Sequence, residues 1–118
     1  MIYRFLVTQP HLNAHGTLHG GILMKWVDEV CGIEARLLSK SVVATRHIKE
    51  IDFQSTVRLG DIVEVVVRHV ETRRTSMTFT ATVRDTSGTL IANFERVVFV
   101  AVDELHRPIP VERAGSDV

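Results

Sequence analysis

The chain has 118 residues, of which 45% are hydrophobic, and this length suits one domain of ordinary size without room for a second core. Its 14 basic and 14 acidic residues give a formal net charge of zero, which argues against a nucleic-acid-binding protein that depends on a broad positive field. No apolar run approaches the ~18 residues that a membrane span needs, so we expect neither a nucleic-acid nor a membrane partner.

The hydrophobic pattern predicts one strand, one long helix and then four strands. Residues 2–8 alternate between apolar and polar side chains, and residues 11–21 are rich in turn formers. A helix is expected from Gly20 or Gly21 to about Lys40, because its apolar residues recur with helical spacing. The later strands are expected at 42–56, which is mixed and bulged, and at 62–72, 76–84 and 89–102.

The predicted helix is apolar over most of its circumference, so other elements must wrap it. Glu34 falls inside the apolar arc, which we attribute to imperfect registration of the helical wheel, with a buried ion pair or a functional role as alternatives. The connections at 59–61, 73–74 and 85–88 are short, which predicts antiparallel hairpins. The polar face is expected to carry Lys25, Asp28, Glu29, Gly32, Arg36, Ser39 and Lys40.

One long helix followed by strands predicts an α+β fold in which an antiparallel β-sheet wraps around a central helix, the hot-dog architecture. We expect a single domain over residues 1–118, with a tail from about residue 103. Cys31, the single cysteine, is expected to fill the core in a reducing compartment. The N-terminal segment is too short and too alternating for a signal peptide, so the predicted location is cytoplasmic.

The candidate chemistry lies between Asn13 and Asp28. Gly20 and Gly21 begin the helix, where the first N–H groups lack intrahelical partners and could hold a carbonyl oxygen, with the Gly21 amide as the preferred donor. Asp28 follows Gly21 by seven residues and lies about 20° around the axis. Gly32 presents no side chain and is expected to leave space beside the carboxylate. The alternative is a solvated aspartate on a polar helix face, with the glycines serving only as a turn.

The pattern Asn13-x-x-Gly16-x-x-His19-Gly20-Gly21, followed after six residues by Asp28, resembles the signature of hot-dog acyl-CoA thioesterases. The phenylacetate-pathway type and the YciA/brain acyl-CoA hydrolase type share this signature. Three further segments favour the second type, and the resemblance extends from about residue 5 to 111. These segments are residues 42–53, residues 59–63, and residues 99–103 followed by 107–110.

The resemblance implies an enzyme that hydrolyses acyl-CoA to a free acid and coenzyme A. It implies that Asp28 is the general base or nucleophile and that Asn13 of the partner protomer positions the attacking water or the thioester. It also implies that the backbone of His19, Gly20 and Gly21 forms the oxyanion hole.

The same resemblance assigns coenzyme A contacts and an assembly. Arg74 and Ser76 match a position that contacts coenzyme A in the family, and His19 stands where many members carry phenylalanine. The shared site requires a homodimer, and family analogy adds a trimer of dimers. No cofactor is implied, because coenzyme A is part of the substrate.

Three other functions stay open at this point. A regulatory module could bind acyl-CoA without hydrolysing it, although the presence of both Asn13 and Asp28 argues for hydrolysis. A dehydratase or hydratase on the same fold could use His19 with Asp28 or Glu29. An aryl-acyl-CoA thioesterase of the phenylacetate-pathway type is the third.

A metal site is not expected. His11, His15 and His19 recur every four residues, as on the face of a helix. Pro10 and Gly16 disfavour a helix through them, and no aspartate, glutamate or cysteine completes an evident ligand set.

Overall fold

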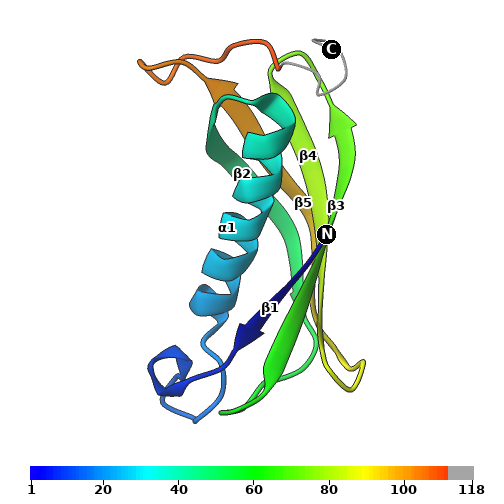
Figure 1. Ribbon diagram of the computed structural model, residues 1–118. Coiled ribbons are helices and arrows are strands. Elements are labelled where there is room, and N and C mark those ends of the chain that lie inside the picture. The colour runs from blue at the N-terminus through cyan, green and yellow to red at the C-terminus, as the bar shows by residue number, and fades with distance from the viewer. Residues whose placement is uncertain (112–118) are drawn as a thin grey trace.

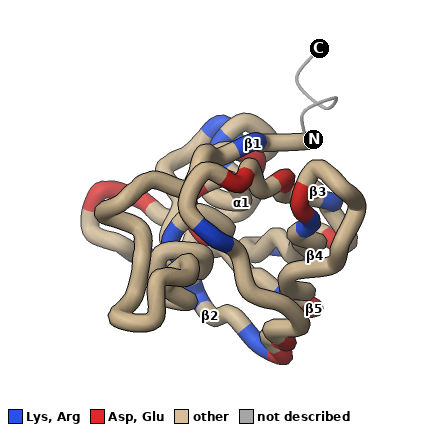
Figure 2. The backbone as a smooth tube through the Cα atoms, turned by 90° about the horizontal axis from the view of Figure 1, so that it is seen from below, with Lys and Arg blue, Asp and Glu red and all other residues tan. Residues whose placement is uncertain are grey.

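The computed structural model describes residues 1–111 and shows five antiparallel strands curled around one helix (Figure 1). The sheet order is β1-β3-β4-β5-β2, and α1 packs along the concave side, so the hot-dog fold is confirmed. Seen from below, the sheet curves around part of α1, from β1 through β3, β4 and β5 to β2, and acidic and basic residues are interspersed around the molecule (Figure 2). The elements are β1 (Ile2–Leu6), η1 (Gln9–His11), α1 (Gly20–Ser39), β2 (Val42–Phe53), β3 (Ile62–Thr72), β4 (Ser76–Asp85) and β5 (Leu90–Val102).

The core lies between α1 and the inward face of the sheet. Alternation along β4 places Met77, Phe79, Ala81 and Val83 in this core with almost no exposure, as the apolar–polar pattern predicts. The helix is less fully wrapped than its sequence suggests. Its core-facing residues are Leu23, Trp26, Val27, Val30, Cys31, Ala35 and Ser39.

The exposed face of α1 differs from the prediction in both directions. Ser39 was expected on the polar face but is fully buried, whereas Ile33 and Leu37 are 47% and 64% exposed. The apolar arc therefore extends beyond what the sheet of one chain covers. Two large aliphatic side chains on an open helix face are typical of a contact surface for another chain.

Glu34 lies on the buried side of α1, so imperfect registration of the wheel is the wrong explanation for its position. The hydroxyl of Tyr3 in β1 donates a hydrogen bond to Glu34 Oε2, which gives the half-buried carboxylate a partner. Further along β1, Phe5 stacks on Trp26 with ring centroids 4.6 Å apart. These two contacts hold β1 against the helix.

The prediction that residues 59–61 close a hairpin is wrong. β2 pairs with β5, whereas β3 pairs with β1 and β4, so the 54–61 connection crosses from one side of the sheet to the other. Val57, 2% exposed, anchors this connection in the core, and its carbonyl accepts the Leu18 amide at 2.7 Å. The hairpins at 73–74 and 85–88 are confirmed.

β2 is the terminal strand at its end of the sheet and pairs only with β5. The predicted bulge is confirmed, because the register shifts between Thr45 and His47. The other edge of β2 has no partner strand within residues 1–111. A long open edge of this kind is a ready template for pairing with a second chain.

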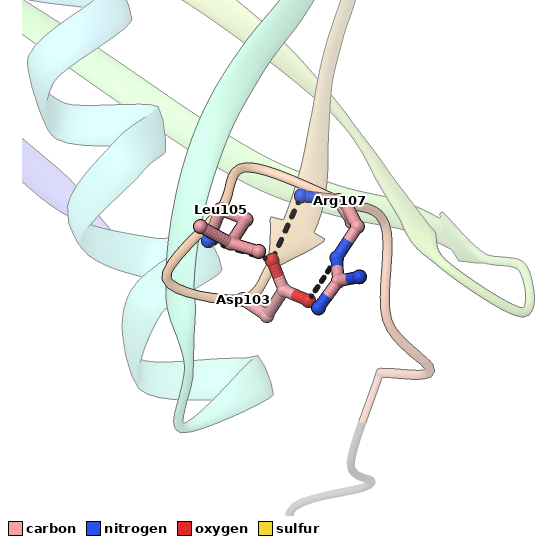
Figure 3. Close-up of polar contacts among 3 residues, drawn as sticks. All are labelled: Asp103, Leu105 and Arg107. Carbon is pink, nitrogen blue, oxygen red and sulfur yellow. Dashed lines mark hydrogen bonds and ion pairs between the residues drawn. The ribbon is translucent and has the colours of Figure 1, made fainter.

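After β5 the chain makes a tight turn that folds residues 107–109 back onto the strand end (Figure 3). Asp103 accepts the backbone amides of Leu105 and Arg107, each at 2.9 Å, and pairs with the Arg107 guanidinium. The amide and guanidinium of Arg107, with the Leu105 amide, lower the pKa of Asp103.

Residues 1–111 contain no helix with the length and hydrophobicity needed to cross a bilayer.

Candidate active site

Asp28 lies midway along α1 and is half-buried. Its Oδ1 atom accepts a hydrogen bond of 2.6 Å from the hydroxyl of Thr45, which β2 presents toward the helix. A short hydrogen bond to a carboxylate is among the stronger ones in proteins, and it fixes the side-chain rotamer. Thr45 therefore belongs to the site, although the sequence reasoning did not select it. The available signal was alternation along 42–45, which puts Val43 and Thr45 on one face.

A groove of about 740 Å³ opens beside Asp28 between α1, β1 and the sheet. Gly32 was expected to leave space beside the carboxylate, but that position is already occupied. A Cβ on Gly32 would lie 3.3 Å from the Phe99 ring, so the missing side chain admits Phe99 against the helix. The apolar lining of the groove consists of Phe5, Val30, Ile33, Leu37, Val43 and Phe99.

The helix begins with a histidine cap. The imidazole Nδ1 of His19 accepts the Gly21 amide at 2.9 Å, so the proton of the neutral ring lies on Nε2. The Gly21 amide was the preferred oxyanion donor, and it can serve a substrate only when the His19 ring turns away. The Gly20 amide has no acceptor within residues 1–111 and is the first amide of α1, one residue nearer the N-terminal end of the helix than Gly21. Both glycine amides thus stay candidates for that role.

Asn13 organises the loop that precedes the helix. Its Oδ1 accepts the backbone amides of His15 and Thr17, and its Nδ2 donates to Thr17 Oγ1 at 3.0 Å. Asn13 also lines a cavity of about 210 Å³ together with Gly20 and Phe53. This cavity and the groove beside Asp28 share no lining residue.

One chain therefore does not bring the predicted site residues together. Gly21 and Asp28 are separated by seven residues of helix, a rise of about 10 Å. A thioester bound at Gly21 would have to lie stretched along the axis to reach the Asp28 of the same chain, because reacting atoms approach within ~3–3.5 Å. Asn13 lines the cavity near the helix start, with Gly20, and not the groove of Asp28.

Arg74 and Ser76 lie at the β3–β4 turn, toward the end of the molecule where α1 finishes. Arg74 is exposed, and its carbonyl accepts the Val111 amide at 2.8 Å, while the Ser76 carbonyl accepts the Arg73 amide. Neither residue lines the Asp28 groove or the Asn13 cavity.

Cys31 lies one turn from Asp28 but faces the core. Burial, together with the nearby Asp28 and Glu34 carboxylates, raises the pKa of its thiol to about 12. A thiol in this state is a core side chain and not a nucleophile, as its place on the apolar arc predicts.

The recurring histidines do not converge. The chain from 11 to 19 contains no α-helix through them, and His11 instead accepts the Thr8 amide and packs edge-on against Trp26. Within residues 1–111 no three histidine, cysteine or acidic side chains are grouped in a way that could hold a metal ion.

Residues 15–92, which include the His-Gly-Gly turn, Asp28 and Thr45, match the Thioesterase superfamily. The chain belongs to this superfamily. The thioesterase match begins just after Asn13 and ends within β5, so it covers the central helix and most of the sheet.

Similar proteins are known from Zymomonas mobilis and Homo sapiens. An uncharacterized acyl-CoA thioester hydrolase of Zymomonas mobilis is 32% identical over 92% of this chain and 75% of its own length. The cytosolic acyl coenzyme A thioester hydrolase of Homo sapiens is 35% identical over 61% of this chain, which spans only 19% of that protein. A hexameric acyl-CoA thioesterase of known structure superposes with a TM-score of 0.86 at 33% identity, covering 96% of this chain and 75% of that chain.

The acyl-CoA hydrolase of Staphylococcus aureus superposes with a TM-score of 0.85 at 26% identity, covering 96% of this chain and 71% of that one. Its structure is known with butyryl coenzyme A, coenzyme A and coenzyme A disulfide. Structures are also known for variants in which an asparagine, an aspartate or a threonine is replaced by alanine. The sequence separations among those three residues equal the separations among Asn13, Asp28 and Thr45.

Proposed function

We propose that this thioesterase hydrolyses acyl-CoA to a free acid and coenzyme A, with Asp28 as the general base or nucleophile. The observation that carries the proposal is a half-buried carboxylate, held by Thr45, at the edge of a largely apolar groove. The matching separations of Asn13, Asp28 and Thr45 in the Staphylococcus aureus hydrolase support the same three residues here.

The chemistry needs a base and a place for negative charge. Asp28 takes a proton from water as the water oxygen attacks the thioester carbon, and the carbon–sulfur bond then breaks to release the coenzyme A thiolate. In the nucleophilic alternative, Asp28 attacks the carbon directly, the carbon–sulfur bond breaks to release the coenzyme A thiolate, and water later hydrolyses the acyl anhydride that has formed. General-base assistance contributes about 100- to 10,000-fold, and amides at a helix N-terminus stabilise the oxyanion.

The site is completed by a second chain in this proposal. Thr45, which contacts Asp28, lies near the N-terminal end of β2. Phe53, which borders the cavity of Asn13, lies at the C-terminal end of the same strand. When two β2 edges pair antiparallel about a two-fold axis, the Thr45 end of one strand lies beside the Phe53 end of its partner. Such pairing brings Asn13 and the helix start of one protomer toward Asp28 of the other.

The open face of α1 supports the same assembly. Ile33 and Leu37 line the outer part of the groove beside Asp28, are exposed in the single chain, and would be covered by a partner chain. Hexameric relatives extend this proposal to a trimer of dimers. Arg74 and Ser76 are proposed to contact coenzyme A, which enters as part of the substrate and not as a cofactor.

The decisive experiment compares thiol release from acyl-CoA by the wild type and by Asp28→Asn, which keeps the side-chain shape. We expect at least a ~100-fold lower kcat with coenzyme A binding retained. Binding without turnover by the wild type would instead identify an acyl-CoA-binding module, and hydration of an enoyl thioester would identify a hydratase. Single turnover in ¹⁸O-labelled water separates the two attack modes, since label enters the Asp28 carboxylate only through a covalent intermediate.

A further inference from the structure

We infer that Phe99, packed against Gly32, forms the floor of the acyl-binding part of the groove and restricts the substrate to unbranched aliphatic acyl groups. This inference rests on the proposed function, since it takes Asp28 as the point where the thioester carbon is attacked. The floor is defined by the Phe99 ring and the helix backbone at Gly32.

Register in the sheet ties the floor to the reacting carboxylate. Thr45 and Phe99 are direct cross-strand partners on β2 and β5, and both point toward α1. Thr45 reaches Asp28, whereas Phe99 reaches Gly32, which is one helical turn, about 5.4 Å, further along the helix. When the thioester carbon lies beside Asp28, the acyl chain that extends from it along the helix therefore reaches the Phe99 ring within roughly its first four carbon–carbon bonds.

The floor is built to stay in place. Phe99 is 3% exposed and is backed by the ring of Phe79, edge-on, with centroids 6.3 Å apart. Phe79 is 1% exposed and does not line the groove. Because the ring is packed on both sides, it cannot move aside for a bulky substituent without opening the core.

The neighbouring surface selects the chemical class of the group that lies on this floor. Val43, from β2, continues the apolar surface toward the C-terminal end of α1, while Glu29 and Arg36 lie on the outer side of the helix. A polar coenzyme A moiety gains nothing from this apolar surface, whereas each buried methylene of an acyl chain gains roughly fourfold in affinity. Because this floor lies one helical turn from Asp28 and cannot yield, a ring or a branch close to the carbonyl meets it before a straight chain does.

The glycine sets the height of the floor. A Cβ at position 32 would approach the Phe99 ring to 3.3 Å, which is too close without a shift of the ring. Gly32→Ala is expected to push the ring toward the groove, and Phe99→Leu is expected to lower the floor. Alanine is also the better helix former, so Gly32→Ala has no backbone reason to lose the fold.

The test measures kcat/KM for hexanoyl-CoA and phenylacetyl-CoA, whose ratio is independent of the amount of folded enzyme. We expect the wild type to prefer hexanoyl-CoA by about 10-fold or more, Phe99→Leu to reduce this preference about 10-fold, and Gly32→Ala to increase it. Val83→Ala is the control: Val83 is buried in β4, six residues from Met77, which is the cross-strand partner of Phe99, and it lines neither cavity. Its truncation loosens the core away from the floor and should change the ratio less than about twofold.

The outcomes separate this inference from the function on which it rests. If the wild type shows Asp28-dependent hydrolysis with no preference, or if Phe99→Leu and Gly32→Ala leave the ratio unchanged, the floor is wrong and the function stands. An equal effect of Val83→Ala would also overturn it, because general loosening of the core would then explain the change. If the wild type hydrolyses no acyl-CoA, the proposed function itself fails.

Discussion

A mixture of two inactive variants tests whether each active site takes residues from two chains. Asn13→Ala removes the side chain that lines the cavity at the helix start, and Asp28→Ala removes the carboxylate from the separate groove. Each variant alone should be at least ~100-fold slower than the wild type, since every site then lacks one of the two groups. Mixing them tests the geometry, because neither cavity contains both residues.

The expected recovery follows from two-fold symmetry. A site that combines Asp28 of one protomer with Asn13 of the other is intact when each group comes from the undamaged chain. Random exchange in an equal mixture makes about a quarter of the sites intact. The mixture should therefore regain about a quarter of wild-type thiol release, which is roughly 25-fold above either variant.

A second mixture controls for non-specific recovery. Asp28 and Thr45 contact each other within one chain at 2.6 Å. Mixing Asp28→Ala with Thr45→Val should therefore give no more than the average activity of the two variants, because no pairing of these chains rebuilds the contact. If native mass spectrometry shows mixed dimers while the first mixture stays inactive, the shared site is refuted.

Three further predictions follow from contacts in the core and at the site. Thr45→Val removes the hydrogen bond to the Asp28 carboxylate, which is worth about 1.5–3 kcal/mol, so kcat should fall about 10- to 100-fold. Thr45→Ser keeps the hydroxyl and should retain most activity. Equal losses in both variants would contradict the role of the hydroxyl. Burial first, and then the hydrogen bond and charge of Glu34, raise the pKa of Tyr3 to about 12, and because Tyr3 is the single tyrosine, an absorbance titration reads it directly. Glu34→Gln should lower that midpoint. Because the pKa of Tyr3 is higher in the folded than in the unfolded chain, the protonated Tyr3 hydroxyl stabilises the fold fully below about pH 10, and this stabilisation is lost as the pH rises toward 12. With its thiol pKa raised to about 12, Cys31 should resist iodoacetamide at pH 8.5 in the folded protein and react in urea; fast labelling of the folded state would show that the thiol is not buried.

The elements of the fold were largely readable from local pattern, but their pairing was not. The bounds of α1 and β3 agree with the prediction, because each follows from a period within one segment. The partner of β2 was missed, since a short connection suggested a hairpin and the anchoring of Val57 in the core is a tertiary contact. Exposure of Ile33 and Leu37 also depends on how far the sheet extends around the helix, which no local period reports.

In the candidate site, too, some residues could be predicted from the sequence and others depend on tertiary contacts. Asp28, Asn13 and the two glycines were selected from spacing and resemblance, and their roles stay predictions. Thr45 was not selected, because its contact with Asp28 exists only after β2 packs against α1. Phe99 packs against the helix where Gly32 has no side chain, and these two residues are far apart in sequence. The sequence alone could therefore suggest only an empty space beside Gly32.

The terminal position of β2 has a consequence for how the enzyme is studied. If its open edge is where protomers join, the concentration of complete sites obeys mass action, and specific activity should decline once the protein is diluted below the dissociation constant of the pair. Substrate that bridges both chains would then protect activity against dilution. Turnover numbers obtained at trace enzyme concentration would report association as much as chemistry.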